Sequence, residues 1–420
     1  MTAPPVTPPL PSAAELDALR ASIGADLPNY LADLEHLVNI DCGSYTPAGV
    51  NEVGDWVAVF LAELGASVER RPDPAGRLGD TLVATFDGRA GGPRALLIGH
   101  MDTVFDPGTA AERPFRIEDG VAYGPGVTDM KSGLLAGLYA LKAIITERGG
   151  LPFERVVVVA NPDEEIGSPT STPHIRALAE GTDVALVLEC ARANGDIVSA
   201  RKGILDLRIV VHGRAAHAGV EPEKGRSAIL EAARIVKELH ELNGRWPDVT
   251  VNVGTIGGGT RPNVVPERCT LEVDVRAATR EALEIAEAEI RQVADATEVP
   301  DTAVEYEPMA RWWPMEKLER SGRLVDHAQA VAGVLGFDVA DATTGGASDA
   351  NTTSGMGIPS LDGLGPIGCN DHSPAEYLDV DSIVPRTTLL AGLLLAIAAD
   401  PEIQDWRGEP DGRDGPDAML

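Results

Sequence analysis

The sequence predicts an α/β protein with a mixed, mostly parallel sheet, helices on both faces of that sheet, and a second domain inserted into the first. Three observations support this prediction. The 420 residues exceed what a single core usually holds. Residues 13–202 alternate helical patterns with short, continuous apolar runs, as in sheets buried on both faces. From about residue 203 to residue 312 the order of elements changes, and the α/β pattern then returns.

The first part of the main domain, residues 13–202, supplies most of the predicted parallel sheet. Its strands read as apolar runs such as VVVV at residues 156–159, with turn residues at their ends. Between them lie segments with helical spacing of apolar residues. The expected helices span residues 15–39, 50–64 and 133–145, and the expected strands span residues 81–86, 95–99, 156–160 and 184–188.

The inserted domain, residues 203–312, follows the order βαββαβ. This order is typical of a ferredoxin-like unit, in which two helices cover one face of a four-stranded sheet. The expected strands span residues 205–211, 249–256, 269–276 and 303–307, and the expected helices span residues 227–242 and 280–294. The main domain resumes over residues 313–405 with helices at 319–335 and 383–398, and residues 1–12 and 406–420 are expected to be flexible tails.

Composition excludes several classes of protein. The longest apolar run, LAGLLLAIAA from Leu390, is shorter than the roughly 18–20 residues of a membrane span. The N-terminus lacks the basic start and apolar core of a secretory signal, so a cytoplasmic protein is expected. The four cysteines form no C-x-x-C pair, which argues against a zinc ribbon and a disulfide framework. A net charge of -30 would repel nucleic acid.

The first chemical signal is His100-Met101-Asp102, where a predicted strand ends. Residues two apart on an extended backbone point to the same side, so His100 and Asp102 can be neighbours. A carboxylate beside an imidazole fixes its tautomer and makes it a better metal ligand. A histidine with a purely structural role is the alternative explanation of this motif.

Two further motifs place carboxylates beside loops. Asp129, in GPGVTDMKSG, precedes a predicted helix, where an aspartate often serves only as an N-cap. Glu164 and Glu165, in NPDEEIGS, follow a buried strand at the edge where open α/β sheets bind ligands. Adjacent side chains diverge, so one glutamate can face a metal and the other the substrate.

Glu189, after another apolar strand, and His372, in NDHSPAEY, complete the set. Each of these residues alone could be a solvated loop charge. Together, two histidines and three carboxylates at strand ends and helix starts form a nitrogen and oxygen ligand set suited to two zinc ions. Three carboxylates and one hydroxide balance the charge of two such ions, which leaves Glu164 free to take a proton from the attacking water.

The ordered series GHMDTV, GPGVTDMK, DEEIG, LEC and DHSPAEY resembles the co-catalytic zinc metallopeptidases. That family includes glutamate carboxypeptidase, aminoacylase, succinyl-diaminopimelate desuccinylase and bacterial dipeptidases. The resemblance covers residues 80–390 and is strongest to the glutamate carboxypeptidase branch. It differs at Cys190, where the family often has proline or glycine; this difference concerns the shape of the loop rather than the ligand.

The resemblance implies a role for each site residue. Asp129 would bridge two Zn²⁺ ions per subunit, which Co²⁺ or Mn²⁺ can replace. His100 and Glu189 would complete one site, and Glu165 and His372 would complete the other. Glu164 would be the general base, and Asp102 would orient His100.

The inserted domain offers two residues for catalysis and assembly. His217, in GRAAHAG, can donate a hydrogen bond to the oxyanion of the transition state. In the family this histidine reaches the active site of the other subunit, which implies a homodimer joined through the inserted domains. Asn263, in RPNVVP, is a second candidate for contact with substrate. A surface histidine without function is the alternative for His217.

Three further segments are candidates for substrate binding. Arg276, in DVR, can pair with a substrate carboxylate through its planar fork, although a strand-end arginine is often only solvated. Gly345 and Gly346, in GGASDA, allow close approach of the backbone to a ligand, and the resemblance suggests that they line the pocket. Arg311 would bind an acidic side chain of the substrate, such as that of glutamate.

The predicted function is zinc-dependent hydrolysis of an amide bond, which releases a C-terminal amino acid, glutamate included, from a peptidyl or N-acyl substrate. An N-acyl-amino-acid deacylase or a dipeptidase with the same residues is the alternative. A zinc-bound binding protein is a third possibility, although such a protein would have no need of Glu164. A serine hydrolase is excluded because the sequence has no G-x-S-x-G motif.

Overall fold

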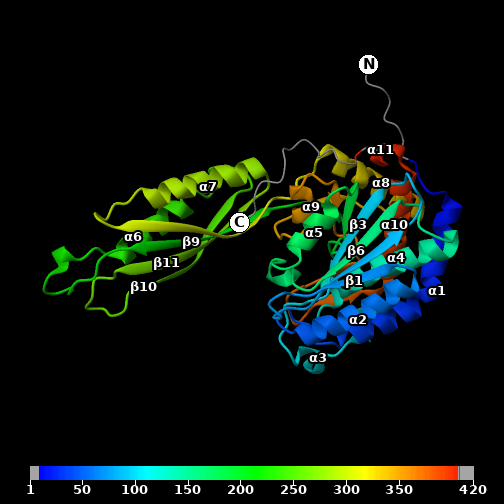
Figure 1. The fold of residues 1–420 in the computed structure, drawn as a ribbon, viewed down its shortest axis with the longest axis horizontal. Coiled ribbons are helices and arrows are strands. Elements are labelled where there is room, and N and C mark those ends of the chain that lie inside the picture. Colours follow the sequence, from blue (N-terminus) through cyan, green and yellow to red (C-terminus); the bar gives the residue numbers. More distant parts are fainter. Residues whose placement is uncertain (1–8, 405, 407–420) are drawn as a thin grey trace, which may run out of the picture. The chain divides into compact units, whose positions relative to one another are not determined.

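The computed structural model describes residues 9–404 and 406, which form two compact units (Figure 1). The main unit contains residues 9–199, Lys317–Thr343 and 348–406, and the inserted unit contains Ala200–Glu316 and Thr344–Ala347. The inserted unit is thus longer at both ends than the predicted residues 203–312. The backbones of Arg201 and Met315 exchange two hydrogen bonds, of 2.9 and 3.1 Å, which tie its entering and leaving segments together.

The main unit is built on a six-stranded sheet in the order β1-β2-β6-β3-β7-β14. The three pairings among β6, β3, β7 and β14 are parallel, and β1 and β2 run antiparallel, so the predicted fold class is confirmed. The strands are β1 (Ser67–Arg71), β2 (Thr81–Asp87), β3 (Arg94–His100), β6 (Arg155–Asn161), β7 (Val184–Val187) and β14 (Ser360–Leu361). The sequence did not predict β1, which is rich in charge, or β14, which has two residues.

The register of the two central strands determines where the polar side chains lie. His100 at the end of β3 pairs with Asn161 at the end of β6. The segment Asp163–Glu165 follows β6 directly, in a short helical turn at Glu164–Ile166. His100 and both glutamates therefore lie at the same edge of the sheet.

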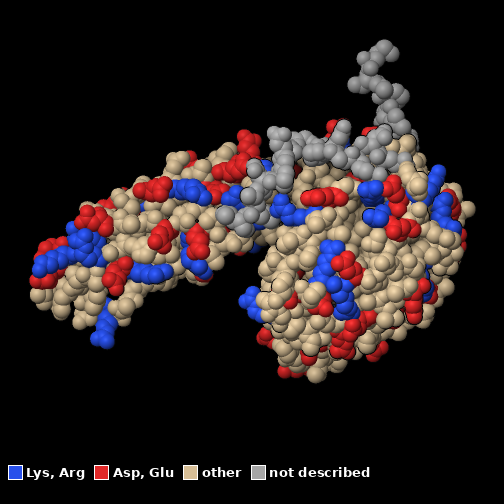
Figure 2. Space-filling model, viewed as in Figure 1, with Lys and Arg blue, Asp and Glu red and all other residues tan. Residues whose placement is uncertain are grey.

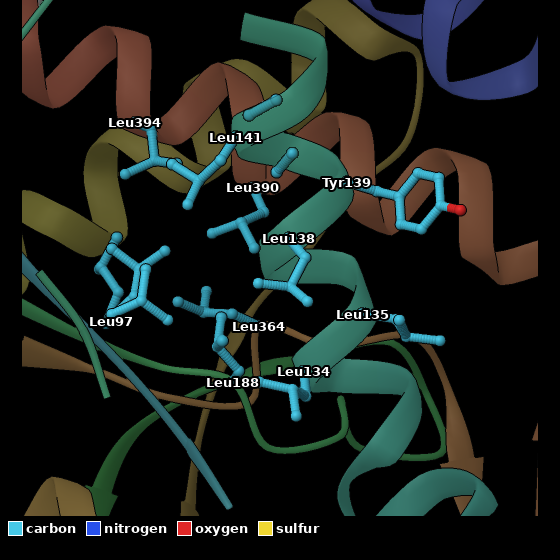
Figure 3. Packing of buried hydrophobic residues seen from close by; sticks show 14 of the residues in the cluster. Leu97, Leu134, Leu135, Leu138, Tyr139, Leu141, Leu188, Leu364, Leu390 and Leu394 are labelled. Atoms are coloured by element: carbon cyan, nitrogen blue, oxygen red, sulfur yellow. The ribbon is translucent and has the colours of Figure 1, made fainter. Parts of the chain in front are cut away.

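Helices pack against the sheet and one another to bury a single large core. They are α1 (Ala13–Val38), α2 (Pro47–Glu63), α3 (Thr109–Glu112), α4 (Ser132–Arg148), α5 (Thr172–Ala179), α8 (Glu319–Leu335), α9 (Asp349–Gly355), α10 (Ile383–Ala399) and α11 (Pro401–Gln404). Figure 3 shows Leu138 of α4 and Leu390 of α10 close together within this core. At Gly133 a Cβ would lie 1.8 Å from the carbonyl oxygen of Leu188, so glycine allows α4 to approach the strand end that precedes Glu189.

Both ends of the described chain differ from the predicted tails. Ser12, which the sequence assigns to the N-terminal tail, caps α1 in a reciprocal pair of bonds with Glu15. Trp406, which the sequence assigns to the C-terminal tail, is buried in the core, because a large aromatic ring gains by leaving water. Residues 1–8 and 407–420 of the predicted tails lie outside the described residues.

One helical stretch in the described residues, Val380–Ala399, is long and apolar enough to cross a membrane. This corrects the expectation that no apolar run reaches that length, since the helix includes polar residues around the run. In the structure 78% of its most apolar window is buried inside the protein. Its apolar character is that of a central core helix.

A small second sheet in the order β15-β16-β5-β4 supports two loops of the site. Its strands are β4 (Arg116–Glu118), β5 (Val121–Tyr123), β15 (Gly368–Cys369) and β16 (Tyr377–Asp379). The loop from β15 to β16 carries His372, and the turn at Val127–Lys131, soon after β5, carries Asp129. The sequence did not predict these strands of two or three residues. A two-stranded sheet is formed by β8 (Ile197–Arg201) and β13 (Asp341–Thr344).

The inserted unit is an antiparallel sheet in the order β10-β11-β9-β12 with two helices packed against it. Its elements are β9 (Gly203–His212), α6 (Ala228–His240), β10 (Thr250–Gly258), β11 (Arg268–Ala277), α7 (Arg280–Asp295) and β12 (Ala303–Trp312). Side chains alternate along β9 between buried and partly exposed, as in a sheet with one covered face. On the face shown in Figure 2, acidic and basic side chains are interspersed over the surface of each unit.

Candidate metal centre and active site

Asp129 lies between two histidines that come from distant parts of the chain. Its Oδ1 is 3.1 Å from Nε2 of His100, and its Oδ2 is 3.2 Å from Nε2 of His372. The helix α4 begins only at Ser132 and has no side-chain N-cap. Asp129 therefore does not cap α4, and its two oxygens face different partners.

Two more carboxylates complete the cluster, one beside each histidine. Glu189, which follows β7, places Oε1 3.7 Å from Nε2 of His100, and Glu165 places Oε2 3.1 Å from Nε2 of His372. His100 is buried, whereas His372 is about half exposed at 56%. The five residues predicted as metal ligands thus meet in one place.

The spacing of these atoms is compatible with metal coordination. A zinc ion that binds nitrogen and oxygen at about 2.0–2.2 Å sets neighbouring ligand atoms about 3.3–3.6 Å apart. The four separations of 3.1, 3.7, 3.2 and 3.1 Å are close to this range. Imidazole and carboxylate are also the donor types that zinc accepts, so the residues fit the metal.

The electrostatics of the cluster favour a cation. Hydrogen bonds to Asp129 and Glu165 raise the pKa of His372 to about 11. Burial would lower the pKa of His100, but the nearby carboxylates of Asp102, Asp129 and Glu189 outweigh it and raise that pKa well above its usual value. Several carboxylates thus surround each imidazole, and this excess of negative charge suits metal ions.

Asp102 contacts both His100 and the turn that carries Glu164 and Glu165. It is fully buried, and its Oδ1 lies 3.3 Å from Nδ1 of His100. The backbone N–H groups of Glu164 and Glu165 donate to its two oxygens at 3.1 and 3.2 Å, and the hydroxyl of Ser44 donates to Oδ2 at 2.6 Å. One carboxylate therefore orients His100 and fixes the turn that carries both glutamates.

Glu164 differs from Glu165 in its surroundings. One of its carboxylate oxygens lies within 4.8 Å of ligand atoms of His100 and Glu189. Burial, together with the charges of Glu189 and Asp349, raises the pKa of Glu164 well above its usual value. Burial raises the pKa of Glu165 too, but the carboxylate of Glu165 lies 3.1 Å from Nε2 of His372. Glu164 is therefore the stronger candidate for a general base.

Glu376 is a further residue of the site, and the sequence analysis did not identify it although it belongs to the same motif as His372, DHSPAEY. Its buried carboxylate accepts hydrogen bonds from the backbone N–H groups of Gly126, Thr128 and Asp129 at 2.9, 2.9 and 3.1 Å. Burial raises its pKa to about 7 in spite of these bonds. Glu376 therefore holds the turn of Asp129 against the loop of His372.

Replacing Glu376 with glutamine is expected to weaken zinc binding about 10- to 100-fold. The amide NH₂ would face at least one of the three backbone donors, so the turn of Asp129 would shift. Competition with a chromophoric chelator measures the affinity, and the melting temperature of the metal-free protein shows whether folding changes. Glu63→Gln at the exposed end of α2 is the control. Zinc affinity within twofold of wild type in Glu376→Gln would contradict this role.

Other buried polar groups support the same edge of the sheet. Asp163 accepts from the backbone and hydroxyl of Thr170, each at 2.6 Å, and so fixes the loop that follows the glutamates. Asp349 contacts Asn161 and accepts from the hydroxyl of Ser168 at 2.6 Å. Burial raises the pKa of Asp349 to about 6. The charged run at 163–165 was the local signal for Asp163, and Asp349 lies in the segment GGASDA.

In the inserted unit, His217 and Asn263 lie on paired segments. His217 forms an antiparallel bridge with Val264, and the carbonyl of Asn263 accepts from the backbone N–H of Ala218 at 3.0 Å. The exposed ring of His217 accepts a hydrogen bond at Nδ1 from Gly219 N–H, at 3.2 Å. A neutral imidazole with this acceptor carries its proton on Nε2, so that atom can donate.

Arg276 and the glycine segment also lie together in the inserted unit. Nη1 of Arg276 donates to the carbonyl of Gly345 at 2.9 Å, while Nε lies 3.1 Å from Oδ1 of Asp274. The carbonyl of Gly346 accepts from Arg201 at 3.1 Å. Arg311 pairs with Glu287, so its guanidinium already has a carboxylate partner within the unit. The substrate-binding roles of these residues stay predictions.

Comparison with known proteins identifies relatives along most of the chain. The model of peptidase family M20/M25/M40 matches residues 96–396. The chain is 33% identical over 379 residues to carboxypeptidase G2 of Pseudomonas sp. (strain RS-16), covering 89% of this chain and 90% of that protein. It is 27% identical to succinyl-diaminopimelate desuccinylase of Leptothrix cholodnii, covering 82% and 93%.

Solved structures share the fold. Aminopeptidase PepT from Bacillus cereus matches with a TM-score of 0.73 at 24% identity, covering 89% of this chain and 99% of that one. The M20 family metallo-carboxypeptidase Sso-CP2 from Sulfolobus solfataricus matches with a TM-score of 0.65 at 17% identity, covering 88% and 99%.

Proposed function

Because the chain belongs to peptidase family M20/M25/M40, we propose that this hydrolase uses two zinc ions to release a C-terminal amino acid from a peptidyl or N-acyl substrate. The observation that carries the proposal is Asp129, whose two oxygens face His100 and His372 at 3.1 and 3.2 Å. Glu164 lies within 4.8 Å of the His100 side of this cluster.

In this proposal His100, Asp129 and Glu189 hold one ion, and Asp129, Glu165 and His372 hold the other. When bound, the ions would polarise the scissile carbonyl and make water more acidic. Glu164 takes the proton of the attacking water and later delivers it to the nitrogen of the leaving amine. The protonated nitrogen departs as an amine, and no covalent intermediate is needed.

The oxyanion of the tetrahedral transition state needs a hydrogen-bond donor, and we assign that role to His217 of a partner subunit. Its exposed ring carries the Nε2 proton that such a bond requires, because Nδ1 accepts from Gly219. A donor aimed at developing negative charge is worth about 10²–10³ in kcat. This role requires a homodimer joined through the inserted units.

Mixing two inactive variants tests this arrangement. A His217→Ala chain keeps its own Glu164, and a Glu164→Ala chain keeps its own His217. After subunit exchange about half of the dimers are mixed, and each has one working site, so about a quarter of wild-type activity is expected. His240→Ala, at the exposed end of α6, is the control and should be active without mixing. Mixed dimers that regain no activity would remove the role of the partner subunit.

For the substrate, we propose that Arg276 binds the free α-carboxylate of the amino acid to be released. An arginine fork suits a carboxylate, and the relative carboxypeptidase G2 is named as a carboxypeptidase. A substrate carboxylate would have to compete with Asp274, which already pairs with Arg276. Deacylation of an N-acyl amino acid is the second candidate, since the relatives also include an acetylornithine deacetylase of Proteus mirabilis, 31% identical over 272 residues.

A panel of substrates tests the proposal. Dipeptides and N-acyl amino acids that differ at the C-terminal residue are assayed with the zinc-loaded protein. Hydrolysis of a substrate with a free C-terminal carboxylate, and not of its C-terminal amide, supports a carboxypeptidase or deacylase. Equal rates of hydrolysis of the free acid and of its C-terminal amide would show that the enzyme does not require the substrate carboxylate. The absence of hydrolysis across the panel would contradict the proposed reaction.

A further inference from the structure

A pocket of about 260 Å³ adjoins the candidate metal centre within the main unit. One of its walls is Glu165, the residue assigned to the second metal ion, so the pocket opens beside the reacting atoms. Pockets for whole drug-sized ligands measure about 300–1,000 Å³, so this one suits a part of a substrate. It is lined by Gly43, Ser44, Tyr45, Thr46, Thr103, Val104, Phe105, Asp106, Pro107, Glu165 and Ile166.

The two loops that form this pocket are joined by backbone contacts. Gly43 bridges Thr103, and the backbone N–H of Ser44 donates to the carbonyl of Thr103 at 3.3 Å. A Cβ at Gly43 would lie 2.4 Å from the carbonyl oxygen of Phe105, so only glycine permits this approach. The hydroxyl of Ser44 reaches Asp102 at 2.6 Å, which ties the wall to the residue that orients His100. The pocket is thus a preformed part of the site.

The lining combines apolar, hydroxyl-bearing and acidic side chains. Tyr45 and Val104 are exposed at 75% and 40%, so their apolar surface is accessible to a ligand. The charged lining residues are Asp106 and Glu165, and the lining contains no Lys, Arg or His. Nearby, Arg113 stacks on the ring of Phe105 at 4.5 Å and donates to the carbonyl of Ser373 at 3.4 Å.

We propose that this pocket binds the acyl group of the substrate and selects an uncharged, apolar acyl group over one that carries a carboxylate. The inference rests on the proposed hydrolase function and names its substrate class. Tyr45 and Val104 contact the acyl chain, and the exposed carboxylate of Asp106 repels a second carboxylate there.

The charge of the lining also decides which end of the substrate the pocket receives. The released amino acid carries a free carboxylate, and Asp106, the acidic lining residue that is not assigned to a metal ion, disfavours it. The acyl side of the scissile bond needs no charge. The pocket therefore suits the acyl group and not the amino acid.

Four N-acylated forms of one amino acid test the inference: acetyl, isovaleryl, phenylacetyl and succinyl. The zinc-loaded wild type is expected to favour isovaleryl over succinyl by at least about tenfold in kcat/KM. Tyr45→Ala should lower the ratio of phenylacetyl to acetyl by about tenfold, because it removes the aromatic wall. Asp106→Lys should raise the ratio of succinyl to isovaleryl by about fivefold, because it replaces repulsion with attraction.

Two substitutions on exposed parts of the main unit serve as controls. Val59→Ala on α2 removes a side chain of similar exposure, at 58%, and Asp338→Lys makes the same change of charge at an exposed position outside the lining. Both should leave the ratios between acyl groups as in wild type. Ratios that stay unchanged in Tyr45→Ala and Asp106→Lys while hydrolysis proceeds would overturn the acyl pocket and leave the proposed function intact.

A binding measurement separates the pocket from the reaction. Calorimetry on the zinc-loaded Glu164→Gln protein gives the affinities for the same four compounds. Tighter binding of isovaleryl than of succinyl compounds, lost in the variant that combines Glu164→Gln with Asp106→Lys, supports the pocket even if the wild type hydrolyses none of them. Equal affinities for all four compounds, or no binding, would overturn it.

Discussion

Replacing Glu164 with glutamine is expected to lower kcat by about 10³-fold while both zinc ions stay bound. Glutamine keeps the shape of the side chain but cannot take the proton of the attacking water, and the loss of a general base costs about 10²–10⁴ in rate. Burial and the neighbouring charges of Glu189 and Asp349 raise the proton affinity of this carboxylate in the metal-free protein. Steady-state kinetics and the zinc content per subunit are the two measurements.

The adjacent Glu165→Gln is the matched comparison. Glu165 contacts His372 at 3.1 Å, so this change is expected to weaken one metal site and to be partly rescued by excess zinc. Since Glu164 also lies within 4.8 Å of two ligand atoms, the zinc content tests whether it is a ligand instead. Loss of zinc from Glu164→Gln, or a rate near that of wild type, would contradict the assignment of Glu164 as the base.

The positions of His100, Glu165 and Glu189 could be predicted because each lies at or just after the end of a strand of the main sheet. His100 ends β3, and the pair of glutamates follows β6, which runs parallel to β3 in register. Continuous apolar runs in a sequence predict buried strands. Residues that bind ligands lie at the edge of the sheet where parallel strands end. A sequence pattern therefore locates these residues in three dimensions without any knowledge of the loops.

The supporting residues could not be predicted, because they depend on contacts between loops far apart in sequence. Glu376 reaches Gly126 across 250 positions, and Ser44 reaches Asp102 across 58. The small sheet that brings the loops of Glu376 and Gly126 together has strands of two and three residues, which are too short for an alternating pattern. The sequence assigned Trp406 to the C-terminal tail because the residues around it are polar, although its ring is buried.

The acidic residues of the site differ in their hydrogen-bond partners, and this difference indicates different roles. Asp102 accepts three hydrogen bonds and Glu376 accepts three, so both stabilise loops. Asp129 instead turns both oxygens toward histidines. A carboxylate satisfied by backbone donors fixes geometry, whereas one that faces imidazoles across about 3 Å is placed to share a cation.

Removing zinc by chelation is expected to abolish hydrolysis, and Asp129→Ala is expected to do the same without a chelator. Asp129 places one oxygen 3.1 Å from His100 and the other 3.2 Å from His372, so its loss removes a ligand from both proposed sites at once. Activity should fall at least about 10³-fold, since the loss of metal-assisted catalysis costs several kcal/mol. Kinetics and the metal content after dialysis are the readouts.

His372→Ala separates a shared ligand from a ligand of a single site. His372 contacts Asp129 and Glu165 only on its own side of the cluster, so this variant should keep about one zinc ion per subunit, while Asp129→Ala keeps none under the same dialysis. Added Zn²⁺ or Co²⁺ should restore the chelated wild type and leave Asp129→Ala inactive. Equal metal loss in the two variants would mean that Asp129 is no more shared than His372, and full activity in a verified metal-free wild type would remove the zinc-dependent reaction altogether.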